Sequence, residues 1–252
     1  MKKGIVLIAL ISLCAFTYAQ DKDLTVRDAV IGQWMELRPE QVSGVVWKGQ
    51  TPFFTYRKNS KVLQQVDARN GNEEELFNLK QVNTILQENE QGKIRSLRGY
   101  SWLDEETILL KNGNNYYRML PAQNKLSTTI TYDKDGANPD FSAEANAVAY
   151  TIDNNLYLAT PDNPKIAVTT HQDPEIISGQ EVSRREFNIG TGTFWSPEGN
   201  FLAFYEKDVS DVWSYPIPDL FQRPAARDSI KYPMAGSPSE HVSLGVLNRK
   251  SG

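Results

Sequence analysis

Four charged residues, Glu181, Arg184, Arg185 and Glu186, stand together just before a segment patterned to be buried. Carboxylate and guanidinium groups bind partners of opposite charge through charge-assisted hydrogen bonds, so the chemistry that they offer is binding. The stretch is either a solvated loop or a loop that faces a substrate. In a solvated loop, Glu181 and Arg185 would form a surface ion pair worth about 0.3–0.5 kcal/mol, because they are four residues apart. For Arg184 and Arg185 we prefer this solvated interpretation.

The residue patterns that usually carry catalysis are missing from the sequence. It contains no G-x-S-x-G, H-E-x-x-H, P-loop or G-x-G-x-x-G motif. The two histidines, His171 and His241, are most simply loop or strand-edge residues. Nothing places a serine on the strained strand-to-helix turn that a Ser-His-Asp triad would need. We therefore expect no catalytic residue, no metal site and no cofactor in this chain.

Composition places the chain among ordinary globular proteins. Of its 252 residues, 40% are hydrophobic and 23% are charged, which suffices for a sizeable core. The net charge is -4 and the pI is about 5.4. No run of Lys and Arg forms a basic stripe that would neutralise phosphates, so we do not expect nucleic acid as a partner.

The first nineteen residues have the pattern of a secretory signal peptide. Met1-Lys2-Lys3 is followed by the apolar run GIVLIALISLCAF and then by TYAQD, which predicts cleavage after Ala19 and before Gln20. The apolar run is shorter than the roughly 20 residues of a membrane-spanning helix. We therefore expect an exported protein.

The single cysteine, Cys14, lies inside that apolar run, so the mature chain would contain no disulfide. Lipidation of Cys14 is a minor alternative, because Leu13 is too large for the position before a lipidated cysteine. Export without cysteine favours a Gram-negative periplasm or cell surface over a eukaryotic extracellular space.

A repeated unit runs along the chain. Four stretches share an aromatic anchor, a short polar or Pro/Gly turn, and then two strands rich in apolar and aromatic residues. The anchors are Trp47, Trp102, Phe141 and Trp195, which are 55, 39 and 54 residues apart. These intervals bracket the length of a four-stranded propeller blade.

Strand and turn signals support the repeat independently. Segments such as NFLAFYE and AVAYTI are rich in β-branched and aromatic residues, and GN, NG and DNN supply hairpin turns. Such aromatics would also fit the core of another all-β fold, for example a sandwich, but four copies of one local plan favour a propeller. We predict an all-β fold, a partial β-propeller with about four visible blades, which occupies residues 41–252.

A short helix precedes the predicted propeller. In LTVRDAVIGQW, Thr25 can cap a helix and Asp28 stands three residues later, in the capping-box position. Residues 20–40 are therefore predicted to be an N-terminal helical segment.

The segment around Trp195 also resembles a known family. The stretch FWSPEGNFLAFYEKD, preceded by EF and followed at a distance by YPMAGSPSEHVSLGV, is similar to the N-terminal β-propeller region of bacterial dipeptidyl peptidase IV enzymes. These are members of the prolyl oligopeptidase group of serine peptidases. The resemblance covers most of the mature chain and is strongest from AVAYTIDNNLYLAT onward.

The resemblance implies a role for one glutamate. In this family a glutamate motif of the propeller binds the free α-amino group of a peptide substrate, and Glu186 in RREF matches it. The family pattern has two adjacent glutamates, but Arg185 occupies the preceding position here, so Glu181 is the candidate for the second carboxylate. The family also has a substrate-contacting arginine near LLKNGNNYY, where Lys111 is the nearest stand-in.

The resemblance implies that the catalytic serine, aspartate and histidine belong to a C-terminal α/β-hydrolase domain, which we expect to lie outside this chain. We therefore expect the propeller portion of an exported serine exopeptidase that removes dipeptides ending in Pro or Ala. Its expected partners are peptides with a free N-terminus and the hydrolase domain of the full-length chain; dimerisation, which is common in the family, is a further expectation. The alternative is a non-catalytic binding or scaffold propeller, or an inactive truncated product.

Overall fold

The computed structural model describes residues 23–38, 42–224 and 226–251, so the predicted signal peptide lies outside the described residues. The chain divides into two compact units, with the boundary between Val42 and Ser43. The exact limits of the predicted domains stay a prediction. Among the described residues, no helix has the length and apolar character needed to cross a membrane.

The first unit contains the predicted short helix. Helix α2 (Val26–Val30) is followed by one 3-10 turn, η1 (Gly32–Trp34). Thr25 is its N-cap, and the capping box with Asp28 forms in both directions. The reciprocal bonds satisfy backbone donors that the first helical turn leaves free, which explains why the helix begins here.

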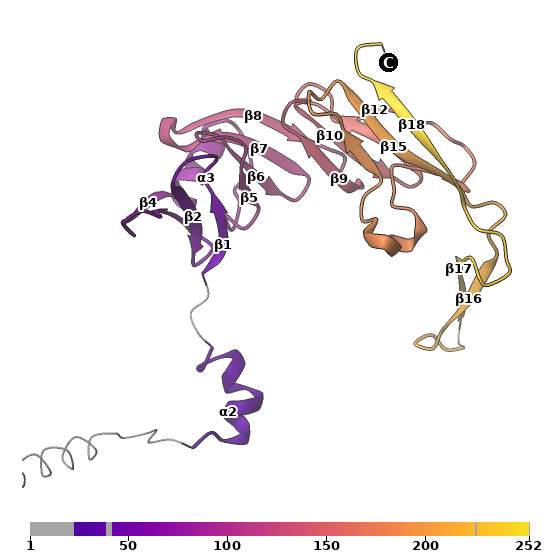
Figure 1. The fold of residues 1–252 in the computed structure, drawn as a ribbon, viewed down its shortest axis with the longest axis horizontal. Coiled ribbons are helices and arrows are strands. Elements are labelled where there is room, and N and C mark those ends of the chain that lie inside the picture. The colour runs from indigo at the N-terminus through magenta and orange to yellow at the C-terminus, as the bar shows by residue number, and fades with distance from the viewer. Residues whose placement is uncertain (1–22, 39–41, 225, 252) are drawn as a thin grey trace, which may run out of the picture. The chain divides into compact units, whose positions relative to one another are not determined.

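The second unit is built of antiparallel sheets (Figure 1). The strands of the first sheet pair in chain order: β1 (Ser43–Trp47), β2 (Phe53–Lys58), β3 (Val62–Asp67) and β4 (Glu73–Asn78). Those of the second sheet do the same: β5 (Tyr100–Trp102), β6 (Ile108–Asn112), β7 (Asn115–Leu120) and β8 (Lys125–Thr131). The third repeats the plan: β9 (Ala137–Ser142), β10 (Ala147–Ile152), β11 (Asn155–Ala159) and β12 (Ile166–Ala167).

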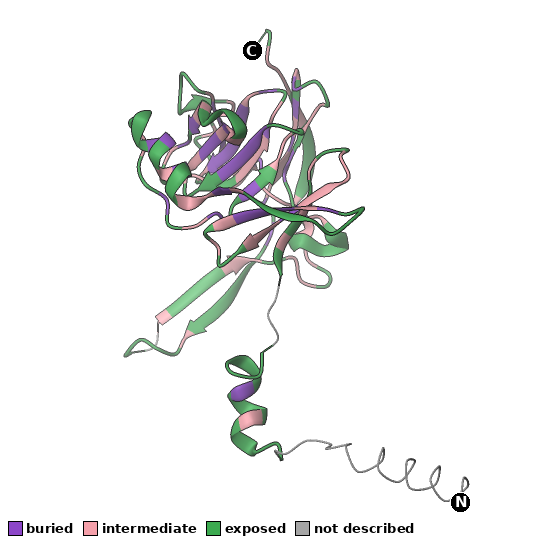
Figure 2. Cartoon of the chain, turned by 90° about the vertical axis from the view of Figure 1, so that its left-hand side faces the viewer, coloured by how far each residue is buried: buried purple, intermediate pink, exposed green. Residues whose placement is uncertain are grey.

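The fourth sheet departs from this plan. Its central strand β15 (Phe201–Asp208) pairs on one side with β18 (His241–Asn248) and on the other with two short strands, β13 (Ile176–Ser178) and β14 (Thr193–Trp195). Between β15 and β18 the chain forms a separate hairpin of β16 (Ser214–Asp219) and β17 (Ala226–Lys231). Figure 2 shows this hairpin largely exposed, whereas the buried residues gather in the sheets.

The four anchoring aromatics occupy equivalent places, as the repeat predicts. The first three lie at or next to the end of the first strand of their sheets, and Trp195 ends β14, the second of the two short edge strands of the fourth sheet. All but Trp47 contact the preceding sheet. Trp102 Nε1 donates to Thr55 Oγ1 (2.9 Å), and Trp195 Nε1 donates to the carbonyl of Asp140 (3.3 Å). Phe141 stacks on Tyr116 of the second sheet at 5.3 Å between ring centroids. The predicted partial propeller is confirmed by this arrangement.

Three hydrophobic clusters lie between successive sheets. Because neighbouring residues of a strand face opposite sides, each inner sheet contributes to two clusters. Leu110 packs toward the first sheet and Leu109 toward the third; in the same way, Val148 packs toward the second sheet and Ala149 toward the fourth. Burial on both faces explains why these strands read as continuous apolar runs.

One helix was not predicted. Helix α3 (Leu79–Glu88) follows β4 and buries Val82, Ile85 and Leu86 in the first cluster. The sequence does contain signals for this helix. Asn78 and Gln81 form a capping box, and the buried residues follow helical spacing.

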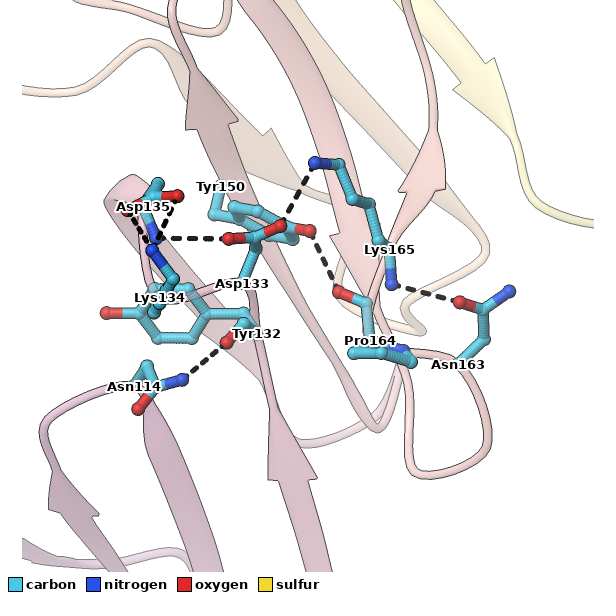
Figure 3. A network of polar contacts seen from close by, with 9 residues as sticks. All are labelled: Asn114, Tyr132, Asp133, Lys134, Asp135, Tyr150, Asn163, Pro164 and Lys165. Atoms are coloured by element: carbon cyan, nitrogen blue, oxygen red, sulfur yellow. Dashed lines mark hydrogen bonds and ion pairs between the residues drawn. The ribbon is translucent and has the colours of Figure 1, made fainter.

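Polar side chains also hold together the strands and loops of the third sheet (Figure 3). The Tyr150 hydroxyl donates to the carbonyl of Pro164 (2.8 Å), and Lys165 Nζ forms an ion pair with Asp133 (3.0 Å). Burial raises the pKa of Tyr150 to about 12, so the phenol stays a hydrogen-bond donor. These bonds connect β10 and the segment before β9 to the segment between β11 and β12.

Candidate functional site

An interrupted strand creates the candidate site. In the fourth sheet, β13 and β14 pair with opposite ends of β15: Ile176 lies opposite Asp208, and Thr193 lies opposite Phe204. The edge strand is thus split, and residues 179–192, which we call the charged loop, leave the sheet between its two halves. This is the loop that the sequence predicts to carry the candidate glutamates.

The charged loop has a closed neck. The amide of Gly179 donates to the carbonyl of Tyr205 (2.8 Å), and the amide of Tyr205 donates to the carbonyl of Gly192 (2.9 Å). Gly192 also lies against the backbone of Gln180, so closely that a Cβ atom there would overlap it. The loop is therefore a compact excursion whose two ends meet on β15, in the manner of an Ω-loop.

The backbone inside the loop is strained. Five non-glycine residues have φ between 51° and 67°: Ser183, Arg184, Arg185, Phe187 and Asn188. Such left-handed conformations cost free energy for residues with a Cβ and persist where surrounding contacts enforce them, often at functional sites.

Two contacts fix the first half of the loop. Lys207 Nζ on β15 donates to the carbonyl of Glu181 (2.8 Å), and the amide of Ser183 donates to Glu240 Oε1 (2.7 Å). Ser183 and Glu240 are far apart in sequence, so the segment before β18 holds this part of the loop.

A third contact comes from the end of β17 and the residue that follows it. The Arg184 guanidinium lies over the Tyr232 ring at 4.7 Å, and its Nη1 donates to the carbonyl of Lys231 (3.4 Å). Charged side chains of the loop are thus part of its support, and the solvated interpretation of Arg184 holds only in part.

Glu181 is half-buried and ionised. Its side chain is 26% exposed and forms an ion pair with Arg185 Nε at 3.1 Å, the i,i+4 pair that the sequence predicts. Burial works toward a higher pKa, but hydrogen bonds from its own backbone and from Arg185 outweigh burial and lower the pKa of Glu181. The carboxylate therefore remains an acceptor for a cationic group.

Glu186 lies in the same loop but in a different environment. It is exposed, next to Phe187, whose exposed fraction is 87%. Among the described residues no hydrogen bond or ion pair engages its carboxylate, so the group is open to an incoming ligand. The structure places Glu186 and Glu181 in one loop; the substrate-binding role assigned to them stays a prediction.

Two cavities flank the loop and share Glu181. The larger, which we call the basic cavity, has a volume of about 420 Å³ and is lined by charged side chains of the loop, β15, the end of β17 and the segment before β18. The smaller, the acidic cavity, measures about 180 Å³ and is lined by Asp140, Glu181 and the Gly190–Thr193 segment. Glu186 lines neither.

Sequence reasoning missed Asp140. It lies on β9, and its Oδ2 accepts a hydrogen bond from Thr193 Oγ1 at 2.7 Å. Burial raises the pKa of Asp140, an effect that the bond from Thr193 offsets in part. A signal was available: the residue before the anchoring aromatic is charged only in the third repeat, since the others have Val46, Ser101 and Phe194 there.

The remaining candidate, Lys111, lies elsewhere: it is exposed on β6 and sits over the Tyr116 ring. Arg118 on β7, which is not among the site residues predicted from the sequence, donates to the carbonyl of Ala143 and to Asn146. Both have structural contacts, and neither lines the two cavities beside the charged loop.

The histidines form no triad. His171 Nε2 lies 2.7 Å from Glu206 Oε2, and Ser178 Oγ donates to the same carboxylate oxygen (3.1 Å). The serine therefore contacts the acid and not the imidazole, which a triad would require. His241 is the exposed first residue of β18. In the part of the chain that the structure describes, no three Asp, Glu or His side chains gather closely enough to hold a metal ion.

Comparisons with known proteins agree with this architecture. The model of the family described as the dipeptidyl peptidase IV N-terminal region matches residues 103–252, more than half of the chain. A probable dipeptidyl-aminopeptidase B of Phaeosphaeria nodorum is 33% identical over 41% of this chain and 13% of its own length. Dipeptidyl aminopeptidase B of Saccharomyces cerevisiae is 34% identical over 44% and 15%.

Solved structures are similar as well. A putative dipeptidyl aminopeptidase IV from Bacteroides ovatus has a TM-score of 0.75 and 33% identity, over 84% of this chain and 29% of that one. Porphyromonas gingivalis dipeptidyl peptidase 4, at 20% identity and a TM-score of 0.60 over 91% and 34%, shares the fold. The chain thus spans about a third or less of these relatives. The match over residues 103–252 shows that the chain belongs to the dipeptidyl peptidase IV N-terminal region family.

Proposed function

We propose that this chain is the N-terminal propeller portion of an exported serine exopeptidase that removes N-terminal dipeptides ending in Pro or Ala. The observation that carries the proposal is the charged loop. It leaves the edge of the fourth sheet, has a strained backbone held by surrounding contacts, and contains Glu181 and Glu186. The names of the similar proteins, dipeptidyl aminopeptidases, support it.

In this proposal the two glutamates bind the substrate's α-ammonium group. An α-amino group has a pKa of about 7.7–8.0 in solution, and a nearby carboxylate favours its charged form. The open carboxylate of Glu186 and the ionised one of Glu181 would accept charge-assisted hydrogen bonds. Fixing the ammonium also sets the distance to the scissile bond, which accounts for release of a dipeptide.

Catalysis would lie in a hydrolase domain of the same full-length chain, and the propeller would admit peptides while excluding folded proteins. Export to a periplasm or cell surface is proposed from the signal-peptide pattern of residues 1–19. N-terminal sequencing of the protein recovered outside the cytoplasm tests it; a mature chain that begins at Gln20 is expected, and a chain that retains Met1 would contradict it.

The function is tested with the full-length gene product and chromogenic Gly-Pro and Ala-Ala-Pro amides. We expect release from Gly-Pro amide, a large loss in Glu186→Gln, and no activity for residues 20–252 alone. The loss should be on the order of 10²-fold, because removing one charge-assisted contact that positions the substrate acts on kcat/KM.

Each outcome decides one point. Hydrolysis of the Ala-Ala-Pro amide with no Gly-Pro activity would reassign the protein to tripeptide release. An inactive full-length product would leave a binding or scaffold propeller as the better function. Unchanged activity in both Glu186→Gln and Glu181→Gln would keep the peptidase but remove the amine anchor from the charged loop.

A further inference from the structure

The basic cavity holds more positive than negative charge. Four cationic side chains line it, Arg184, Arg185, Lys207 and Lys231, together with the carboxylates of Glu181 and Glu240. Lys231 is paired with Glu175 at 2.9 Å. With Glu175 included, four cations face three carboxylates, which leaves a surplus of one positive charge.

Two of the four cations have no carboxylate partner among the described residues. Arg185 is engaged by Glu181 and Lys231 by Glu175, whereas Arg184 and Lys207 have no carboxylate within ion-pair distance among the described residues. Lys207 is half-buried, and its ammonium group donates one of its three possible hydrogen bonds to the carbonyl of Glu181. A partly desolvated cation with free donors is stabilised when an anion enters, because attraction between charges is stronger where water is excluded.

The acidic cavity has the opposite character and adjoins this one at Glu181. Among the described residues that line it are two carboxylates, Asp140 and Glu181, and no Lys or Arg. A ligand that carries a cation and an anion a few bonds apart would therefore place its cation at Glu181, which borders both cavities, and its anion in the basic cavity. The N-terminal residue of a peptide that begins with Glu or Asp is such a ligand.

We propose that the basic cavity is a specificity site for the side-chain carboxylate of a substrate's first residue, with Lys207 and Arg184 as its ligands. The proposal rests on the proposed function, since it takes the α-ammonium group to lie at the charged loop. The apolar walls, Val209 and Val212, suit the methylene groups of a Glu or Asp side chain. The chain would thus prefer peptides with an acidic first residue.

The test compares Glu-Pro and Gln-Pro amides, which have nearly the same shape and differ in charge, with the full-length gene product. We expect kcat/KM for Glu-Pro to exceed that for Gln-Pro about tenfold, as for one charged hydrogen bond. Lys207→Met and Arg184→Met should each bring the ratio toward one. Lys58→Met, which removes an exposed charge on β2, should leave it unchanged.

Using the ratio within each variant separates specificity from general damage, because a distorted loop slows both substrates. A wild-type Glu-Pro to Gln-Pro ratio of one, or a ratio that neither cavity variant lowers, would overturn the proposed specificity site. Hydrolysis of both amides would still support the proposed function. If no amide is cleaved, the proposed function fails. In that case the affinities of free Glu-Pro and Gln-Pro dipeptides, measured by calorimetry, test whether the basic cavity binds a side-chain carboxylate. Equal affinities would refute the proposal.

Discussion

At the scale of single residues, the neck of the charged loop can close because Gly192 has no Cβ atom. The carbonyl of Gly192 bonds to β15, while its Cα lies against the backbone of Gln180 at the other side of the neck. The neighbouring Gly190 has open space where a Cβ would be. Two glycines two residues apart therefore have different physical roles.

This difference predicts the effect of alanine at each position. Gly192→Ala should destabilise the protein by about 1–3 kcal/mol, because the added methyl group must push the neck apart. Gly190→Ala should stay within about 0.5 kcal/mol of the wild type. Urea unfolding of both variants checks the pair, and equal stabilities would mean that the neck is not closed as described.

Asp140 makes stability depend on pH. Burial raises its folded-state pKa, so the protonated form favours the folded state. Its stabilising contribution is fully present below the unfolded-state pKa near 3.8 and is lost as the pH rises through the raised folded-state value. Asp140→Asn keeps the shape and removes the titration.

We therefore expect wild-type stability to fall relative to Asp140→Asn as the pH rises above about 4. The difference between their unfolding free energies, measured from pH 3 to 7, isolates this residue from other titrating groups. A constant difference across that range would show that the carboxyl is not desolvated. Asp133→Asn serves as a control of the opposite sign, because the pKa of Asp133 is lowered, chiefly by a backbone hydrogen bond and by Lys165.

At the scale of elements, the repeated sheets could be predicted from sequence, because one local plan recurs and each anchoring aromatic needs a neighbouring sheet. The split of the fourth edge strand could not. Residues 179–192 have no strand pattern of their own, and only the pairing of β13 and β14 with the same strand reveals that they interrupt it. Asp140 joins the site through a contact 53 residues away in the chain, which no local pattern encodes.

Packing between sheets predicts a second contrast. Leu202 on β15 is fully buried between the third and fourth sheets, whereas Leu244 on the adjacent β18 is 61% exposed. Leu202→Ala should cost about 2–5 kcal/mol, from lost burial and the cavity left behind. Leu244→Ala should change stability by no more than about 0.5 kcal/mol. Thermal unfolding tests both; a similar loss for Leu244 would mean that its face is covered in the protein.

At the scale of the whole molecule, the hairpin of β16 and β17 concentrates exposed apolar side chains. Tyr215 and Ile217 lie on β16, and Leu220 and Phe221, with exposed fractions of 76% and 100%, lie in the turn that follows it. Large exposed apolar side chains gathered in one element commonly mark an interface. We therefore predict that this hairpin is the contact surface of the homodimer that the family resemblance leads us to expect for the full-length protein.

The dimer predicts a specific change in mass. Light scattering of the full-length protein at micromolar concentration should give twice the chain mass, and the double variant Leu220→Ser/Phe221→Ser should give the single mass, because hydroxyl groups would replace the apolar contacts. Leu24→Ser is the matched control, since Leu24 is equally exposed at 74% but belongs to the first unit, and it should leave the mass doubled. A wild-type protein that is monomeric, or a double variant that stays dimeric, would exclude the hairpin as the interface. A monomeric Leu24→Ser variant would move the interface to the first unit.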